Sequence, residues 1–189
     1  MNYGNEAIAE PAIPRAQNAL FQHLVDTYAS ETNKTYSTWA CFRDDDLAWR
    51  PHPRSATVGD ILKHHLLSER RFFGEFLDSP EPLAGEVLPA AESIESYRDR
   101  LSNLARPRLE FLAGRSAEWW QMRVPFFDVE REHIWIFWRR VLHSAHHRTQ
   151  LTVYLRLLDC PVPPIYGPTA DATWSGADPT RTVEAASRK

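Results

Sequence analysis

The sequence predicts an all-α protein, an antiparallel four-helix bundle. Several long segments repeat apolar residues at intervals of three and four, which is the spacing of one helix face. Only 7 glycines are present, and alternating runs typical of strands are few. With 189 residues, 43% of them hydrophobic and 12% aromatic, the chain can bury one core. We therefore expect one domain over residues 1–168 and a flexible polar tail over residues 169–189.

The first helix is expected over residues 14–38. Leu20, Leu24 and Tyr28 share one side of it at helical spacing. A loop interrupted by prolines follows and separates this helix from the next one.

The second helix is expected over residues 57–77. Thr57 is a good N-cap residue, and Asp60 lies three positions on, near the positive end of the helix dipole. An apolar stripe runs from Val58 to Phe76, after which a segment rich in proline ends the helix.

Two further helices complete the bundle. The third is expected over residues 93–112, with Pro107 as a kink or an internal boundary and Gly114 as the stop. The fourth, over residues 131–158, is the most apolar, so we expect the other helices to enclose it most fully. Its apolar positions include Ile134, Phe137, Trp138, Val141, Ala145, Leu151 and Leu155.

Composition argues against several classes of function. The 22 basic residues against 25 acidic ones leave a formal charge of −3, so nucleic acid is not an expected partner. Arg139, Arg140 and Arg148 could form a basic stripe on the fourth helix, but that helix is expected to be mostly buried. Cys41 and Cys160 are too few for a disulfide framework or a thiolate metal site, which favours a reducing cytoplasm. No leader or membrane-spanning stretch is recognisable, so no membrane association is expected.

Histidines form the most distinctive pattern in the chain. His143 and His147 lie four residues apart on the fourth helix, where both imidazoles share one face and can bind one metal ion. The spacing alone is weak evidence, because a chain with 8 histidines in 189 residues contains about 0.3 such pairs by chance. Their place on the most apolar helix makes the pair more informative, since inward-facing polar rings need partners.

A third imidazole can come from the second helix, where His64 and His65 are adjacent. Helical phase places His65 in the centre of the apolar stripe and His64 on its flank, so periodicity alone favours His65. The simpler interpretation of His65 is a core histidine bonded to a neighbouring group. The remaining histidines, expected to be too distant, off the shared face or on the surface, are His23, His52, His133 and His146.

Two well-known kinds of metal site do not fit the sequence. A carboxylate-bridged di-iron bundle needs two Glu-x-x-His motifs, and only Glu130 to His133 matches. A zincin metalloprotease needs a glutamate directly after the first histidine, where this chain has Ser144. Three histidines would instead form an open site with a position left for water or substrate, and imidazole suits zinc, nickel, copper or iron.

Two stretches of the sequence resemble the DinB-like (YfiT-like) family of metal-binding four-helix proteins. They are TVGDILKHHLLSERRFF, which begins at Thr57, and LHSAHHRTQLTVYLRLLDCPVPPIYGP, which begins at Leu142. The specific part is Thr-x-Gly-x-x-x-x-His in the second helix, paired with His-x-x-His-His-Arg-x-Gln in the fourth. The similarity covers about residues 15–168. Thr149 stands where most relatives have glycine, a departure that concerns packing more than ligation.

The resemblance implies one divalent metal ion, most often nickel or zinc, bound by His64, His143 and His147. It selects His64 over His65, against helical phase. It also implies a small-molecule substrate, as in transferases that use low-molecular-weight thiols or in hydrolases, because a metal with an open position can keep a thiol deprotonated. The alternative is a non-enzymatic metal-binding module of a stress response.

The roles of several other residues stay open. Asp60 and Tyr154 could orient a ligand, although a capping role suits Asp60 better. Arg148 and Gln150 flank the motif, and we expect a structural role for both. An aromatic cluster before the fourth helix is either exposed, which would favour a homodimer, or packed under its own loop. The cluster consists of Trp119, Trp120, Phe126 and Phe127.

Overall fold

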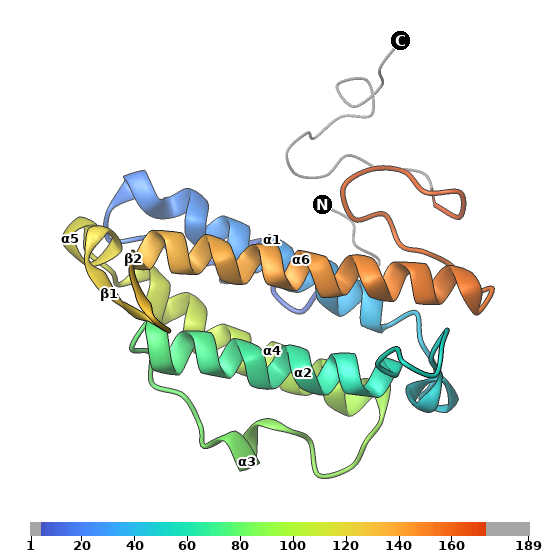
Figure 1. Cartoon of the computed structure of the whole chain (residues 1–189). Helices are drawn as coiled ribbons and strands as arrows, with labels where there is room; N and C mark the ends of the chain where they lie inside the picture. The colour runs from blue at the N-terminus through green and yellow to red at the C-terminus, as the bar shows by residue number, and fades with distance from the viewer. Residues whose placement is uncertain (1–4, 173–189) are drawn as a thin grey trace.

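The computed structural model describes residues 5–172 of the chain. Its long helices are α1 (Gln22–Trp39), α2 (Val58–Arg71), α4 (Ile94–Ala113) and α6 (His133–Leu157), shown in Figure 1. α2 continues directly into one π-helical turn, η4 (Phe72–Phe76). The short elements are η1 (Glu10–Ala12), η2 (Ala19–Phe21), η3 (Asp44–Ala48), α3 (Ala84–Val87), α5 (Ala117–Gln121) and an antiparallel hairpin of β1 (Arg123–Phe126) and β2 (Val129–Glu132).

The long helices form the predicted four-helix bundle. α1 packs against both α4 and α6, and α2 packs against α6. In Figure 1, α2 and α6 run antiparallel along the near side, with α4 behind α2 and α1 behind α6. The connection over residues 78–93, which contains α3, runs the length of the bundle, so α2 and α4 point in the same direction. The bundle is therefore confirmed, with one long crossover in place of a simple up-and-down order.

Two groups of buried side chains hold the helices together. One includes Phe73 and Phe137 and joins α1, α4 and α6 near the hairpin, and the other includes Trp39 and Leu66 and lies toward the opposite end. Burying each apolar side chain of this size stabilises the fold by about 1.5–3 kcal/mol. The seam between α2 and α6 runs over this core.

The predicted starts of two helices are confirmed. Thr57 is the N-cap of α2, and Ser93 is the N-cap of α4. α4 runs without a break through Pro107, so this proline is not an internal boundary, and the helix ends at Gly114 as expected.

The first helix begins later than the sequence predicts. α1 starts at Gln22, and residues 14–18 are non-helical. The side chain of Asn18 accepts a hydrogen bond from the backbone of Leu20, a local bond that competes with an earlier helix start. Leu20, expected on the same helix side as Leu24 and Tyr28, therefore lies outside α1 and is 76% exposed.

The segment before the fourth helix forms a hairpin that the sequence pattern does not predict. Residues 123–132 pair as β1 and β2, so α6 begins at His133 and not at residue 131. The two-residue turn places Phe127 at a φ of 54°. Trp120 and Phe126 are buried under this local structure, whereas Phe127 is 60% exposed, so the aromatic cluster is mostly packed under its own loop.

α6 is less enclosed than expected. Trp138, assigned to its core stripe, is 38% exposed. An outer helix of a bundle keeps one face in solvent. The exposed apolar positions of α6 form two groups with a spacing of three or four residues. One group is Trp135, Trp138 and Leu142, and the other is Val153 and Leu157.

The predicted tail lies mostly outside the described residues. Its first part, residues 169–172, is hydrogen-bonded: Asp171 pairs with Arg156 at 2.5 Å, and Thr169 Oγ1 donates to the carbonyl of Val162 at 2.8 Å. None of the helices within residues 5–172 combines the length and apolar character that a membrane crossing needs.

Candidate metal centre

The start of α2 determines where His64 lies. Thr57 Oγ1 accepts a hydrogen bond from the Asp60 backbone, and Asp60 Oδ2 accepts one from the Thr57 backbone, both at 3.1 Å. This capping box confirms the capping role of Asp60. Gly59 allows α2 to lie close to η3, because a Cβ there would be 3.1 Å from the carbonyl oxygen of Leu47. Two turns beyond the cap, His64 faces the seam between α2 and α6.

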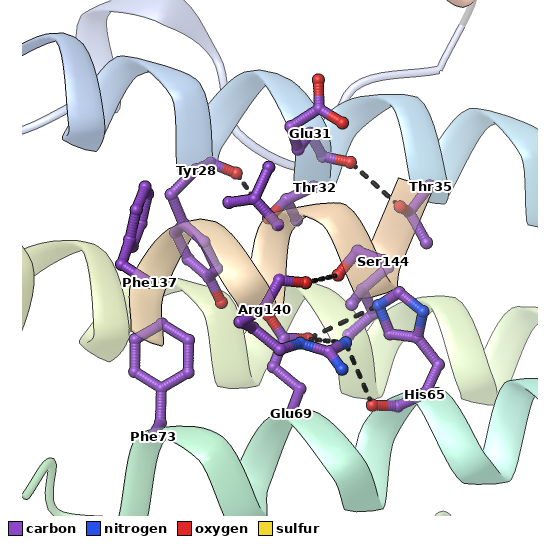
Figure 2. Close-up of a pocket in the computed structure, with 12 residues that line it drawn as sticks. Tyr28, Glu31, Thr32, Thr35, His65, Glu69, Phe73, Phe137, Arg140 and Ser144 are labelled. Atoms are coloured by element: carbon purple, nitrogen blue, oxygen red, sulfur yellow. Dashed lines mark hydrogen bonds and ion pairs between the residues drawn. The ribbon is translucent and has the colours of Figure 1, made fainter. Parts of the chain in front are cut away.

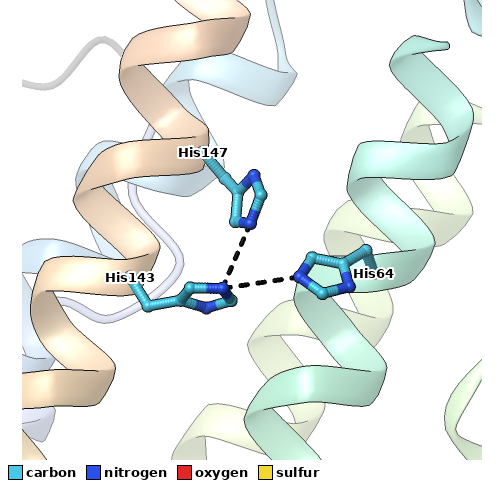
Figure 3. Close-up of side chains that lie close together, drawn as sticks. All are labelled: His64, His143 and His147. Atoms are coloured by element: carbon cyan, nitrogen blue, oxygen red, sulfur yellow. Dashed lines mark hydrogen bonds between the residues drawn. The ribbon is translucent and has the colours of Figure 1, made fainter. Parts of the chain in front are cut away.

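His143 and His147 lie one turn apart on α6 and face His64 across that seam (Figure 3). The Nε2 atom of His143 lies 3.5 Å from Nε2 of His64 and 3.2 Å from Nε2 of His147. One ligand atom from each residue lies within 4.8 Å of the other two. His64 is exposed, and the two histidines of α6 are half-buried.

Two of the three separations match a tetrahedral metal ion. Zinc–imidazole bonds are about 2.0–2.1 Å long, which puts two ligand nitrogens of a tetrahedral site about 3.3–3.4 Å apart. The two separations measured from His143 are 3.5 and 3.2 Å. No carboxylate, thiol or further imidazole joins the group in the described part of the chain. Three protein ligands would leave one position of a four-coordinate ion open.

Gln150 and Tyr154 orient His147. Nδ1 of His147 lies 3.3 Å from the amide oxygen Oε1 of Gln150, so Nδ1 carries the proton and Nε2 keeps its lone pair. Gln150 Nε2 donates to the Tyr154 hydroxyl at 3.1 Å, and this hydroxyl donates to the carbonyl of Ala56 at 3.2 Å. Gln150, expected to be structural, therefore contacts a predicted ligand, and Tyr154 supports it from one turn further on.

Different partners surround His143. Nη1 of Arg140 lies 2.9 Å from Nδ1 of His143, and the Ser68 hydroxyl lies 3.4 Å from it. Arg140 also donates to Ser68 Oγ at 3.1 Å. Sequence reasoning missed both residues as part of the site. The available signal was spacing, because Arg140 lies three residues before His143 and Ser68 lies four after His64, on the same helix faces.

Burial and nearby cations keep the three imidazoles neutral. Burial is the largest cause that lowers the pKa of His64, and Arg140 lowers it further. Burial, followed by Arg140, lowers the pKa of His143 to about 3. Burial also lowers the pKa of His147, although its bond with Gln150 acts in the opposite direction. At pH 7 all three rings are uncharged, which is the form that binds metal.

A buried polar cluster lies behind the site (Figure 2). Oε2 of Glu69 lies 3.6 Å from Nε2 of His65, 3.5 Å from Nη1 of Arg108 and 3.8 Å from Nη2 of Arg140. Within residues 5–172 this oxygen has no hydrogen-bond partner, although two guanidinium groups face it. Arg108 binds Glu81 through two hydrogen bonds of 2.8 and 2.6 Å. A small cavity beside Glu69 has room for about one water molecule.

The other histidines do not join the three. His65 is 3% exposed and lies edge-on to Trp39 in the core, with 5.4 Å between ring centres. The structure therefore places His64 at the seam, as the resemblance implies, and His65 in the stripe, as phase predicts. His133 contacts the carbonyl of Trp119 through Nδ1 at 2.8 Å. The exposed histidines outside the group are His23, His52 and His146.

Arg148 has the structural role expected of it. Nη2 pairs with Oε2 of Glu31 on α1 at 2.5 Å and also bonds the Tyr166 hydroxyl, while Nη1 donates to Thr35 Oγ1 at 3.2 Å. Arg148 is 1% exposed and Arg140 is 2% exposed, so these two cations do not form a basic stripe on the surface.

Solved structures share this fold. A DinB-like protein from Bacillus cereus ATCC 10987 has a TM-score of 0.68 at 19% identity, over 76% of this chain and 95% of that one. A DinB-like protein from Bacillus subtilis has a TM-score of 0.61 at 18% identity, over 76% of this chain and 96% of that one. Identities this low show a common fold and nothing more.

Sequence comparison identifies the family. No curated protein is similar enough to the chain to match it. The sequence profile of the DinB family matches residues 16–179, most of the chain and nearly the range of the resemblance noted from its motifs. The helical bundle, the histidine group on α2 and α6, and this match agree. The chain belongs to the DinB family.

Proposed function

We propose that the protein binds one divalent metal ion, nickel or zinc, through the Nε2 atoms of His64, His143 and His147. The observation that supports this most directly is the spacing of these nitrogens, 3.5 and 3.2 Å, close to the edge of a tetrahedral site. Three neutral ligands leave the ion its full charge, so it would lower the pKa of a thiol or water that takes the open position.

The reaction we propose is a transfer or a hydrolysis on a small molecule, with a low-molecular-weight thiol as the first candidate. The site is accessible because His64 is exposed. Phe72 stacks beside His143, with 6.2 Å between ring centres, and provides an apolar wall on the side of η4. The buried guanidinium of Arg140 behind His143 favours an anion such as a thiolate in front of it.

A non-enzymatic metal-binding module is the second candidate. The three imidazoles come from α2 and α6, so an ion would join two helices that meet only through side chains at this seam. A ligand that binds only the folded state stabilises it, by about 2.7 kcal/mol at one hundred times its Kd. Both candidates therefore predict a lower melting temperature after chelation, and only the enzyme predicts turnover.

Metal analysis of purified protein tests the ligand set. We expect about one ion per chain in the wild type and its loss in His64→Ala, His143→Ala and His147→Ala. His146→Ala is the matched control, because His146 is exposed on the adjoining position of α6 and lies outside the group. A wild type that binds neither nickel nor zinc, or a His143→Ala variant that keeps a full ion, would refute the site.

A thiol-conjugation assay separates the two candidates. Nickel- or zinc-loaded wild type is incubated with small thiols and an electrophile, beside His143→Ala and the control His146→Ala. Conjugation that disappears only in His143→Ala supports the transferase. Metal binding without turnover of any thiol or ester supports the non-enzymatic module.

We also propose a homodimer and a cytoplasmic location. Phe127 and Met122 are 60% and 51% exposed near the hairpin, and we propose that these apolar side chains lie in the interface. Cys41 and Cys160 are free, which supports a reducing compartment. Sedimentation equilibrium of the wild type and of Phe127→Ser tests the dimer. We expect the variant to associate more weakly. A wild type that stays monomeric at high concentration would refute the dimer.

A further inference from the structure

The two histidines of α6 are held from behind in opposite ways. Nδ1 of His147 faces an acceptor, the Gln150 amide oxygen, at 3.3 Å. Nδ1 of His143 faces a guanidinium N–H of Arg140 at 2.9 Å and the hydroxyl of Ser68 at 3.4 Å. A metal-bound histidine almost always donates its second N–H to an acceptor. His147 is arranged for that, and His143 is not.

The partner at Nδ1 determines which nitrogen of His143 holds the proton. A neutral imidazole has one donor nitrogen and one acceptor nitrogen, and guanidinium can only donate. Because Nδ1 of His143 accepts from Arg140, the ring proton lies on Nε2 and is directed at the lone pair of His147 Nε2, 3.2 Å away. A hydrogen-bond chain thus runs from Arg140 through both histidines to Gln150. An ion at the centre has to take the place of that Nε2 proton.

Arg140 has a second acceptor within reach. Its Nη2 donates to the carbonyl of His65 at 3.4 Å and lies 3.8 Å from Oε2 of Glu69. Arg108 and His65 also face that oxygen, at 3.5 and 3.6 Å, yet none of the three groups hydrogen-bonds it within the described residues. Arg140 and Glu69 are buried, at 2% and 3% exposure, so a charge-assisted bond between them would be strong. The small cavity shown in Figure 2 is lined by both side chains, so the space beside them is not filled by other atoms.

Ser68 can serve either protonation state of His143. A hydroxyl donates one hydrogen bond and accepts two, so Ser68 Oγ can donate to a bare Nδ1 or accept from a protonated one. It lies 3.4 Å from that nitrogen, between His143 and Arg140. Once Arg140 has moved away, Ser68 is the acceptor that a metal-bound His143 needs.

We infer that Arg140 is a positioning residue with two hydrogen-bonding arrangements, one for the metal-free and one for the metal-bound protein. In the first, it bonds Nδ1 of His143 and keeps the ring proton on Nε2. In the second, Nε2 has released its proton to solvent and Nδ1 has taken one up, so the ring stays neutral, Nδ1–H donates to Ser68, and Arg140 bonds Glu69. This inference rests on the proposed metal site and adds that Arg140 opposes binding of the ion while Glu69 favours it.

Long-range proton–nitrogen NMR of the 15N-labelled full chain reports the protonated nitrogen of each histidine. In chelator-treated protein we expect His143 protonated on Nε2 and His147 on Nδ1. With zinc added alone, both rings should be protonated on Nδ1. A metal-free His143 protonated on Nδ1, or a zinc-bound His143 with a bare Nδ1, would overturn the inference.

Zinc affinity of two variants tests the opposing effects of Arg140 and Glu69. Glu69→Gln removes the negative charge that attracts Arg140 in the second arrangement, so zinc should bind about tenfold more weakly. In the double variant Arg140→Gln/Glu69→Gln, an amide that can accept replaces the donor at Nδ1 and both buried charges are gone. This protein should bind zinc about tenfold more tightly than wild type. A merely structural role of Arg140 predicts the opposite, a loss of affinity.

Controls separate this inference from the proposed function and from misfolding. Glu75→Gln is the matched control, since Glu75 is a half-exposed glutamate on η4 that bonds Arg71 at 2.9 Å and leaves the cluster intact. Its zinc affinity should equal that of wild type, and circular dichroism checks that all variants are helical. Wild type that binds neither zinc nor nickel refutes the proposed function, and the second arrangement with it. Wild type that binds zinc, beside a double variant that binds it equally or more weakly, refutes only the inference.

Discussion

The guanidinium of Arg140 is the main charge near the proposed metal ligands. It lies 2.9 Å from His143, is 2% exposed, and follows burial as the next cause that lowers the pKa of both His64 and His143. A cation this close to two imidazoles makes it unfavourable for either ring to carry a positive charge. The same charge supports an anion at the open position, so one residue contributes to both properties of the site.

The lowered pKa of His143 makes the metal-free protein less stable in acid. In an unfolded chain a histidine titrates near pH 6.5, whereas the pKa of His143 in the fold is about 3. Between these values the unfolded chain binds more protons than the folded one. The contribution of His143 to the free energy of unfolding is therefore fully present above about pH 6.5 and is lost as the pH decreases toward 3. Urea denaturation of chelator-treated protein at about pH 7 and about pH 4.5 measures this decrease.

His143→Gln should lose less stability than wild type over the same pH range, because one shifted imidazole is gone. His23→Gln, at an exposed position outside the group, is the matched control and should lose as much as wild type. Equal decreases in all three proteins would show that His143 does not contribute.

The adjacent pair His64 and His65 shows what helical phase can predict about a site. Phase places His65 in the apolar stripe, and His65 is indeed 3% exposed in the core. The imidazoles meet at the seam between two helices, however, and the residue that faces a seam lies on the flank of the stripe. Only the motif resemblance selected His64. The contacts of Arg140 and Ser68 depend on how α2 and α6 are placed in space, which no local pattern specifies.

At the scale of elements, the N-terminus of α2 is the piece of local structure that most affects the site. Thr57 and Asp60 satisfy each other's backbone N–H groups at 3.1 Å. Thr57→Ala should lower the free energy of unfolding by about 1 kcal/mol, measured by urea denaturation. Thr149→Ala, at an exposed threonine of α6, is the control and should change it by less than about 0.5 kcal/mol. A Thr57→Ala protein as stable as this control would mean that the cap contributes nothing.

Periodicity predicted the interiors of the long helices better than the segments between them. α2 and α4 have strong caps, Thr57 and Ser93, and their boundaries agree with the sequence. The late start of α1 involves a tertiary contact, the bond from Gln17 N to the carbonyl of Ala113 at 2.7 Å, in addition to the local bond of Asn18. The hairpin over residues 123–132 has strands of only four residues, too short for alternation to be recognised.

At the scale of the whole molecule, the segment after α6 is fastened to α1. The Tyr166 hydroxyl donates to Oε2 of Glu31 at 2.7 Å and bonds Arg148, and Lys34 lies 4.3 Å from the centre of the Tyr166 ring. Burial alone would raise the pKa of Glu31, but Arg148 and Lys34 outweigh it, and the pKa is lowered. The cluster therefore holds an ionised carboxylate between α1, α6 and the returning segment.

Removing one hydroxyl from this cluster should have a measurable cost. Tyr166→Phe should lower the free energy of unfolding by about 0.5–1.5 kcal/mol, because its bond to the Glu31 carboxylate is lost. Tyr36→Phe is the matched control: the Tyr36 ring contacts Arg98 through its face, which the substitution keeps. Urea denaturation of both variants measures the difference, and equal stability would show that the segment is not held through Tyr166.

The convergence of imidazoles from α2 and α6 on one ion is tested most directly by X-ray absorption at the metal edge of zinc- or nickel-loaded protein. The predicted spectrum shows three imidazole nitrogens, for zinc at about 2.0–2.1 Å, with at least one further light-atom ligand from solvent. His64→Ala should lose one of the three imidazoles from the spectrum. In a sample free of added thiol, a wild-type spectrum with fewer than three imidazoles, or with sulfur bound to the ion, would contradict the site.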